Sequence, residues 1–222
     1  LRPRPTPEVA VSAPALVTTT TAMNALHRNR AQVQRLIKAN LLKAPRHHGR
    51  TLLLDPESLQ ALAARHALPD TGNITGTDTA YALALHLGPR RPEQHPIRFG
   101  RDFNGWDNDT DNVDNQWTGW WNAGEAIAAE VCAARLPLLP AVSGFVVDVR
   151  MATGYDVHPL YPGLVRFTTA TPDEDLRARH AEASFLPAAG SPWQRLWTPA
   201  DLPRLAGNTQ GPLDQGRAPH DA

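Results

Sequence analysis

The chain has 222 residues, enough for one large domain or two small ones, because domains commonly hold roughly 100 to 150 residues. Its 22 Lys plus Arg balance its 22 Asp plus Glu, and its single cysteine, Cys132, excludes an intramolecular disulfide and a cysteine-based zinc finger. The sequence has no apolar run of the roughly 20 residues that a membrane-spanning helix needs, so we expect a cytoplasmic protein without a membrane partner.

The charge is divided unevenly along the chain. Residues 1–65 carry ten Lys plus Arg against three Asp plus Glu, a net charge of about +7, and residues 66–222 carry twelve against nineteen, about −7. Within the basic part, residues 24–54 hold seven Lys or Arg, three His and no Asp or Glu. Such asymmetry is typical of a polyanion-binding segment joined to a module of another kind.

The basic part begins with an arm and two predicted helices. Residues 1–14 contain four prolines and no hydrophobic period, so we expect an extended or disordered arm. A first helix is expected from Thr18, because the Thr run supplies an N-cap oxygen and three apolar residues follow on one face. After a break at residues 27–29, Asn29 can cap a second helix, 29–40, with Val33, Leu36 and Ile37 on one face.

A turn and a third helix are predicted next. Residues 45–50 form a turn-rich basic segment, and residues 51–54 read as a short strand, so together they predict a two-stranded wing. Asp55 is a good N-cap and Pro56 suits the first helical position, which predicts a helix through Leu62. Helix, turn, helix, wing and helix therefore follow one another in this order.

This order resembles the excisionase-like or MerR-type winged helix-turn-helix family over residues 16–63. The residues that match the family's helix-packing positions are Ala22, Leu26, Val33, Leu36 and Ile37, and Arg46 to Arg50 match its wing. In the turn between the helices, His27 and Arg28 stand where the family commonly has Gly and an apolar residue, and Asn40 stands where Gly commonly ends the second helix. The resemblance implies a winged helix-turn-helix fold that binds DNA, with helix 29–40 as recognition helix.

The expected DNA contacts divide into base-reading and phosphate-binding side chains. Side chains of the types at Arg30, Gln32 and Gln34 can read base edges through paired hydrogen bonds. Cations on helix 29–40 and on the wing are expected at phosphates. The alternative is a solvated basic face on an ordinary helical hairpin. The complete predicted set is Arg28, Asn29, Arg30, Gln32, Gln34, Arg35, Lys38, Lys43, Arg46, His47, His48 and Arg50.

The remaining chain predicts a second, mixed region. Its small and polar residues 69–79 indicate a linker, and the apolar run 81–87 fits either a helix or a buried strand. Periodicity and β-branched content predict a helix over 125–136 ended by Pro137 and Pro140, strands over 144–150 and 164–169 with a turn-rich connection over 154–163, a helix to about residue 183 capped by a box at 171–174, and a disordered tail from 207 to 222.

Residues 97–124 concentrate four tryptophans and five aspartates among Gly and Asn. Trp106, Trp117, Trp120 and Trp121 suit either a ligand pocket or core and interface anchors. Asp107, Asp109 and Asp111 begin like a calcium loop, but Asn112 and Thr118 occupy positions where an EF-hand needs Gly and Glu. The loop is therefore a divalent-cation site, a solvated acidic loop, or a segment that folds onto the basic module when DNA is absent.

We therefore expect an α+β protein, with an N-terminal winged helix-turn-helix domain, 15–68, followed by a separate α+β domain, 80–206. Its expected function is sequence-specific binding of double-stranded DNA as a homodimer, as a transcriptional regulator or an excisionase-like architectural factor. The second domain would oligomerise, sense a small ligand or recruit a protein partner, and no cofactor beyond the possible cation is expected. The alternatives are an enzyme whose site includes His158 and the tryptophans, and an adaptor that binds an acidic protein.

Overall fold

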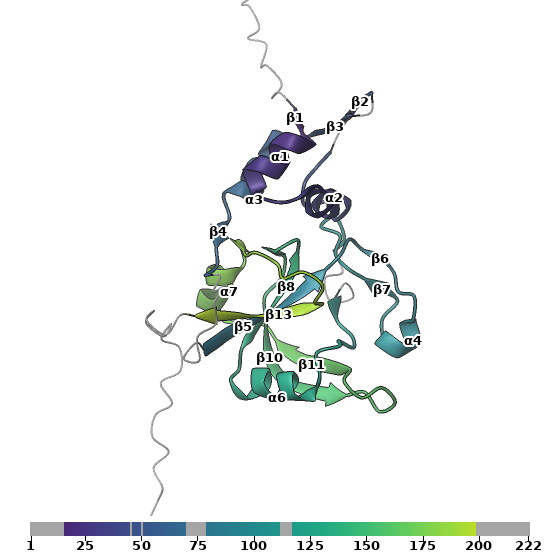
Figure 1. Ribbon diagram of the computed structural model, residues 1–222. Helices are drawn as coiled ribbons and strands as arrows, with labels where there is room; N and C mark the ends of the chain where they lie inside the picture. Colours follow the sequence, from purple (N-terminus) through teal and green to yellow (C-terminus); the bar gives the residue numbers. More distant parts are fainter. Residues whose placement is uncertain (1–15, 45, 50, 70–78, 112–116, 199–222) are drawn as a thin grey trace, which may run out of the picture.

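The computed structural model describes residues 16–44, 46–49, 51–69, 79–111 and 117–198, and its fold is α+β with six helices in these ranges. A small helical unit, residues 16–63, stands on a larger sheet domain that begins at His66 (Figure 1). The predicted arm 1–14, most of the predicted linker, the tail 207–222 and Arg50 of the wing lie outside the described residues. No helix in the described ranges has the length and apolar character needed to cross a membrane.

The helical unit contains the elements that the sequence predicts in this part of the chain. Helices α1 (Thr19–Leu26) and α2 (Arg30–Lys38) precede a hairpin of β2 (Arg46–His48) and β3 (Thr51–Leu54), and α3 (Pro56–Ala63) follows. A strand that we did not predict, β1 (Val17–Thr18), pairs with β3, so the hairpin is part of a three-stranded sheet with the order β1-β3-β2.

Short-range capping explains why these helices begin where the sequence predicts. Thr18 Oγ1 accepts a hydrogen bond from Thr21 N at the start of α1. Asn29 and Gln32 form a reciprocal capping box at the start of α2, with both distances at 2.9 Å. Asp55 caps α3, and Pro56 occupies its first turn. These interactions satisfy backbone N–H groups that have no partner inside the helix.

The sheet domain is organised around two parallel strands. Strand β5 (Thr79–Leu87) pairs with β8 (Pro137–Val142), and α6 (Glu125–Ala133) lies on the connection between them. Strand β13 (Trp193–Thr198) extends the sheet beside β5, and β10 (Arg150–Val157) with β11 (Val165–Ala170) extends it beside β8. The smaller elements are β4 (His66–Ala67), β6 (Arg91–Pro92), α4 (Pro96–Phe99), β7 (Phe103–Asn104), β9 (Phe145–Val146), α7 (Glu174–His180) and β12 (Ala183–Ser184).

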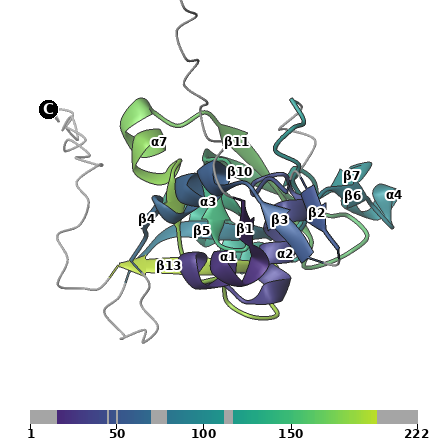
Figure 2. The same ribbon diagram turned by 90° about the horizontal axis from the view of Figure 1, so that it is seen from above.

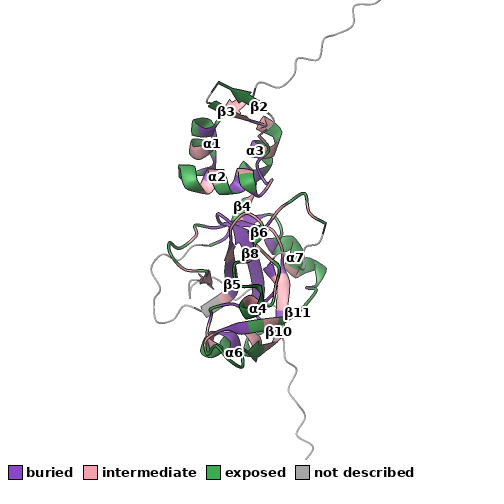
Figure 3. Cartoon of the chain, turned by 90° about the vertical axis from the view of Figure 1, so that its right-hand side faces the viewer, coloured by how far each residue is buried: buried purple, intermediate pink, exposed green. Residues whose placement is uncertain are grey.

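Strand β5 is buried on both faces, which is why its sequence reads as one apolar run without a visible period. Leu83 and Leu85 belong to the larger core cluster, whereas Ala82 and Ala84 belong to a second cluster on the other face. Figure 3 shows the same burial across the centre of the sheet domain. The segment 81–87, for which the sequence allowed a helix or a strand, is therefore a central strand.

Three sequence predictions for the sheet domain were wrong. Residues 137–142, which we expected to end a helix, form the buried strand β8. Pro140 is tolerated there because its carbonyl accepts from Val147 N on the side away from β5, so its own nitrogen also points away from the β5 ladder.

The strand predicted over 144–150 is divided between β9 and the first residue of β10, and β10 continues to Val157 through residues assigned to a turn. Helix α7 is capped by Asp173, which accepts from Leu176 N, instead of a box beginning at Thr171. Long-range pairing decides the strand boundaries, whereas the cap of α7 is a local contact that begins two residues later than predicted.

The helical unit and the sheet domain share one core, so the expectation of a separate N-terminal domain is not confirmed. A single cluster of buried apolar side chains includes Val33 and Leu36 of α2 as well as Leu85 of β5 and Phe145 of β9. Strand β4, which follows α3, pairs in parallel with β12. Viewed from above, the helices lie over the sheet domain (Figure 2).

Candidate nucleic-acid interface

Helix α2 has a buried face and a basic exposed face. Val33 and Leu36 are fully buried, whereas Arg30, Arg35 and Lys38 are exposed. Gln34, between them on the helix surface, is half-buried. The helix therefore presents two arginines and a lysine outward while its apolar stripe holds it in the core.

The wing continues this positive charge. Strand β2 consists of Arg46, His47 and His48, and all three are exposed, as is Lys43 before the hairpin. Within the described part of the chain, the Lys and Arg residues of α2 and of this segment form no ion pair with a carboxylate. Figure 1 shows the wing, α2 and β6 following one another down the same side of the molecule, and Figure 3 shows this side from the front.

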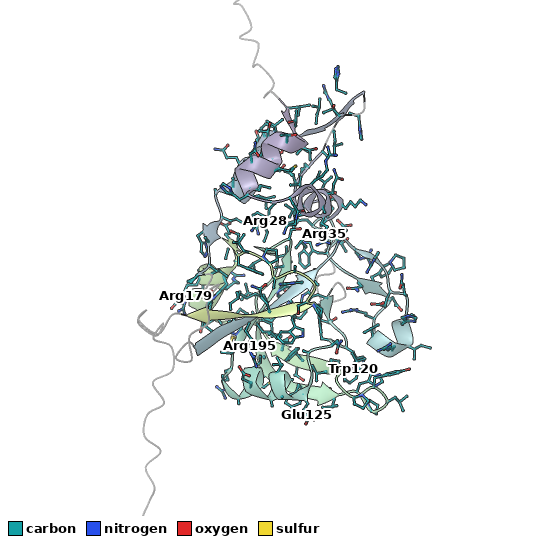
Figure 4. The ribbon with its side chains drawn as sticks, in the orientation of Figure 1. Arg28, Arg35, Trp120, Glu125, Arg179 and Arg195 are labelled. Atoms are coloured by element: carbon teal, nitrogen blue, oxygen red, sulfur yellow. The ribbon has the colours of Figure 1, made fainter. Side chains whose placement is uncertain are left out.

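Arg28, which we expected to contact DNA, is instead buried between the helical unit and the sheet domain (Figure 4). Its Nε donates to Ser143 O at 2.9 Å and its Nη2 to Phe185 O at 2.9 Å. Its guanidinium also lies 5.0 Å from the centre of the Phe145 ring, and burial lowers its pKa. Arg28 fills the turn position where the resembled family has an apolar residue, and it holds the two regions together.

The left-handed conformation of His27 makes that turn possible. His27 has a φ of 51°, which is the conformation that Gly commonly supplies at the end of a helix. Asn40 has a φ of 55° after α2, as expected for the residue that most easily replaces Gly there. Both residues therefore adopt the left-handed conformation that Gly commonly supplies at the end of a helix.

Two side chains of the predicted DNA-contact set, one of them the base-reading candidate Gln32, are used inside the protein. The side chains of Asn29 and Gln32 bind each other's backbone in the capping box of α2. The backbone oxygen of Gln32 also accepts from Ser143 Oγ at 3.0 Å. Of the predicted base-reading residues, Arg30 and Gln34 keep side chains without a capping role.

The acidic loop lies against the C-terminal end of α2. Asn40 Nδ2 donates to Asp107 Oδ1 at 2.9 Å, and Asn108 N donates to Ala39 O at 2.9 Å. The hydrogen bonds from Asn40 and from Asp109 N lower the pKa of Asp107. Of the three alternatives for this loop, contact with the basic N-terminal region is the one that the structure shows for Asp107.

The described structure shows no metal-binding arrangement of Asp107, Asp109 and Asp111. Within the described ranges, no three His, Cys, Asp or Glu side chains come together in a way that could hold a metal ion. The Asp107 carboxylate points to Asn40 and to its own loop, where it accepts from Asp109 N at 3.1 Å. A divalent cation in this loop stays a prediction.

A groove of about 980 Å³ separates α2 from the sheet domain. We call it the α2–β6 groove and define it by Gln34, Arg35 and Lys38 on one wall and His86, Arg90 and Arg91 on the other. None of the described residues that line it is Asp or Glu. Burial lowers the pKa of His86, so the positive charge of the groove at neutral pH comes from its three arginines and its lysine.

Three of the four tryptophans of the Trp-rich segment are core residues. Trp106, Trp117 and Trp121 are buried, and Trp117 Nε1 donates to Asp148 Oδ2 at 3.0 Å. Trp120, labelled in Figure 4, is half-buried. The centre of the Arg166 guanidinium lies 5.0 Å from the Trp120 ring. The structure therefore does not bring the four indoles together around one pocket.

His158, the residue of the enzyme alternative, is held in an aromatic cluster. Its ring lies 4.6 Å from that of Trp120 and 4.8 Å from that of Tyr161. Its Nδ1 accepts from Leu160 N and Tyr161 N, and the nearby Asp156 pairs with Arg166 at 2.8 Å. These contacts shape the loop after β10.

Sequence reasoning missed the sheet-domain wall of the groove. Arg90 and Arg91 are adjacent after Gly88 and Pro89, which is a visible signal, but their position opposite α2 depends on folding across more than fifty residues. Comparison with known proteins adds no assignment, because no family model, no curated protein and no solved structure matches this chain.

Proposed function

We propose that this chain binds double-stranded DNA through the exposed side of α2 and the basic wing. The observation that carries the proposal is a helix, turn, helix and wing whose outward Lys and Arg residues have no described carboxylate partner. Cations without partners can displace the counterions that surround DNA, and this supplies most non-specific affinity. An ordinary solvated helix face would more commonly alternate its charges.

The shape of α2 favours duplex DNA as the ligand. An α-helix fits the major groove of B-DNA, which is about 12 Å wide. Arg30 and Gln34 can pair with base edges, and Arg35 and Lys38 can reach phosphates on either side. Wing residues Arg46, His47 and His48 then contact the neighbouring backbone.

The proposal also includes sequence specificity and dimerisation. One module of this size offers few base contacts, so a homodimer that reads two half-sites would supply the affinity of a transcriptional regulator or an architectural factor. Selection of bound fragments from random duplexes, repeated at two salt concentrations, measures both properties. A motif repeated at a spacing of one helical turn supports a dimer, and the absence of any enriched motif contradicts sequence choice.

The double variant Arg35→Ala with Lys38→Ala tests the interface itself. We expect duplex affinity, measured by fluorescence anisotropy, to fall roughly tenfold or more, because two phosphate contacts and their counterion release are lost. The matched control is Arg177→Ala with Arg179→Ala, which removes the same charge from exposed positions of α7.

Circular dichroism of each protein shows whether its fold is retained. If the α2 variant binds duplex as tightly as the control does, α2 is not the interface and the proposal is wrong. Binding to an acidic protein that duplex does not compete for would instead support the adaptor alternative.

A further inference from the structure

We infer that Arg90 and Arg91 of the sheet domain form a second phosphate-binding arm, which contacts the DNA backbone across the α2–β6 groove from α2. This inference rests on the proposed function and extends it, because it assigns a direct DNA contact to the region that the sequence left without one. The ligand is the phosphodiester backbone of the strand that flanks α2. The wing lies on one side of α2 and β6 on the other, so both flanks of an inserted helix would meet cations (Figures 1 and 3).

Arg90 is held in place before any ligand binds. Its backbone N donates to Trp106 O at 2.8 Å, and its guanidinium carbon lies 3.8 Å from the centre of the Phe103 ring. Its Nε is buried and has no hydrogen-bond partner in the described structure. Arg91 follows in β6, where it pairs with Asn104 of β7, and it is exposed. The hairpin therefore fixes the backbone of both arginines beside the groove.

Neither of these two arginines forms an ion pair within the described residues, and the acidic neighbour that acts on Arg90 electrostatically is Asp107. Arg101 in the same segment, in contrast, pairs with Glu93 at 3.1 Å. The Asp107 carboxylate binds Asn40, and Arg90 helps to lower its pKa, whereas Asp102 lines a separate pocket with Arg90. Four cationic side chains line the groove, Arg35 and Lys38 of α2 and Arg90 and Arg91 of the sheet domain.

The width of the groove is fixed by contacts at both ends of α2. Near its N-terminus, Ser143 Oγ donates to Gln32 O and Arg28 donates to Ser143 O. At its C-terminus, Asn40 and Ala39 bind the Asp107 loop. A preformed site loses little conformational entropy when it binds, so the arm can add affinity without first being ordered.

The size of the groove limits what it can hold. Its volume of about 980 Å³ matches small-molecule sites, which span roughly 300 to 1,000 Å³, so it can take a segment of one strand or a free nucleotide but not a whole duplex. Both ligands offer the same phosphate chemistry. The position of the groove beside the exposed side of α2 favours the strand.

The double variant Arg90→Gln with Arg91→Gln tests the arm in the full chain. We expect the plot of log affinity against log salt concentration to become shallower by about 1.8, since each phosphate contact contributes about 0.9 for B-DNA. Duplex affinity should fall roughly tenfold at moderate salt for the same reason. Arg91→Gln alone, at an exposed position, should give about half of the change in slope.

The matched control removes the same charge elsewhere. Arg135→Gln with Arg179→Gln changes two exposed arginines that do not line the groove, and we expect the wild-type salt slope. Arg90→Lys with Arg91→Lys keeps the charge and should keep most of the slope. A loss of affinity in the control equal to that in the Arg90 and Arg91 variant would overturn the inference, because it would show an effect of net charge alone.

The outcomes separate this inference from the proposed function. If the α2 variant loses affinity while the Arg90 and Arg91 variant keeps the wild-type slope, DNA binding stands and the arm does not exist. If neither variant changes the affinity, both proposals fail. Excess AMP at constant ionic strength should not displace the duplex. Displacement that requires Arg90 and Arg91 would identify a free nucleotide as the groove's ligand and overturn the strand assignment.

Discussion

The helical unit and the sheet domain use their arginines in opposite ways. In the sheet domain, five arginines form ion pairs with carboxylates: Arg101–Glu93, Arg150–Asp148, Arg166–Asp156, Arg177–Glu174 and Arg195–Glu130. The Lys and Arg residues on α2 and before the wing have no such partner in the described structure. A zero net charge therefore conceals an acidic region, whose arginines are largely paired with carboxylates, and a basic region whose cations remain open to a polyanion.

Two sets of arginines do not follow the pattern of the region in which they lie. Arg90 and Arg91 lie in the sheet domain but, like the cations of α2, form no ion pair with any described residue. Arg28 lies in the helical unit but is buried, with backbone oxygens as its partners. Position in the fold, and not position in the sequence, decides whether a cation is available to a ligand.

Arg28→Ala gives the largest expected effect on stability. We expect the free energy of unfolding to fall by about 3 kcal/mol, because buried carbonyls of Ser143 and Phe185 lose a charged donor. Urea denaturation measures this change. Arg30→Ala, at an exposed position of the same helical unit, should change stability by less than about 0.5 kcal/mol.

The same two variants can also show that Arg28 does not differ from the exposed arginines of the helical unit. If Arg28→Ala unfolds at the same urea concentration as Arg30→Ala, Arg28 does not join the two regions. Arg28→Lys sharpens the result, since one ammonium group cannot reproduce the forked donation to Ser143 O and Phe185 O. We expect it to recover only part of the lost stability.

A smaller effect concerns the pH dependence of stability. Burial lowers the pKa of His86 below its ordinary value near 6.5, although hydrogen bonds to Ser191 and Gln194 oppose the shift. The unfolded chain therefore binds a proton at a higher pH than the folded chain does. Stability from this group is complete above about pH 6.5 and is lost as the pH falls toward the lower native pKa.

His86→Gln should reduce this dependence. We expect the difference between unfolding free energies at pH 7.5 and pH 5.5, measured in urea, to be smaller for His86→Gln than for the wild type. His95→Gln, at an exposed position, is the control and should leave the difference unchanged. An equal pH dependence in all three proteins would show that His86 does not titrate differently in the folded state.

The helical unit was predictable because its signals are local. Thr18, Asn29 and Asp55 act within one turn of the helices that they cap, and Val33 and Leu36 mark a helical period. The exposed positions of Arg30, Arg35 and Lys38 follow from the same period. The helices and the hairpin of this region, and the exposure of its α2 cations, could therefore be predicted from sequence.

The sheet domain was less predictable because its strands depend on distant partners. Strand β8 contains two prolines and is recognisable only beside β5, and β10 passes through Gly154, which indicated a turn. The burial of Arg28 and the placement of Arg90 opposite α2 likewise depend on how the two regions dock. No periodicity within a short window carries that information.

The salt dependence of duplex affinity for the unmodified chain tests the central claim most directly. Five exposed cations of α2 and the wing segment form no described ion pair: Arg30, Arg35, Lys38, Lys43 and Arg46. Each phosphate contact contributes about 0.9 to the slope of log affinity against log salt concentration. The account predicts submicromolar to micromolar binding at low salt with a slope of about −4 or steeper. No duplex binding at low salt, or binding with a slope near zero, would contradict it.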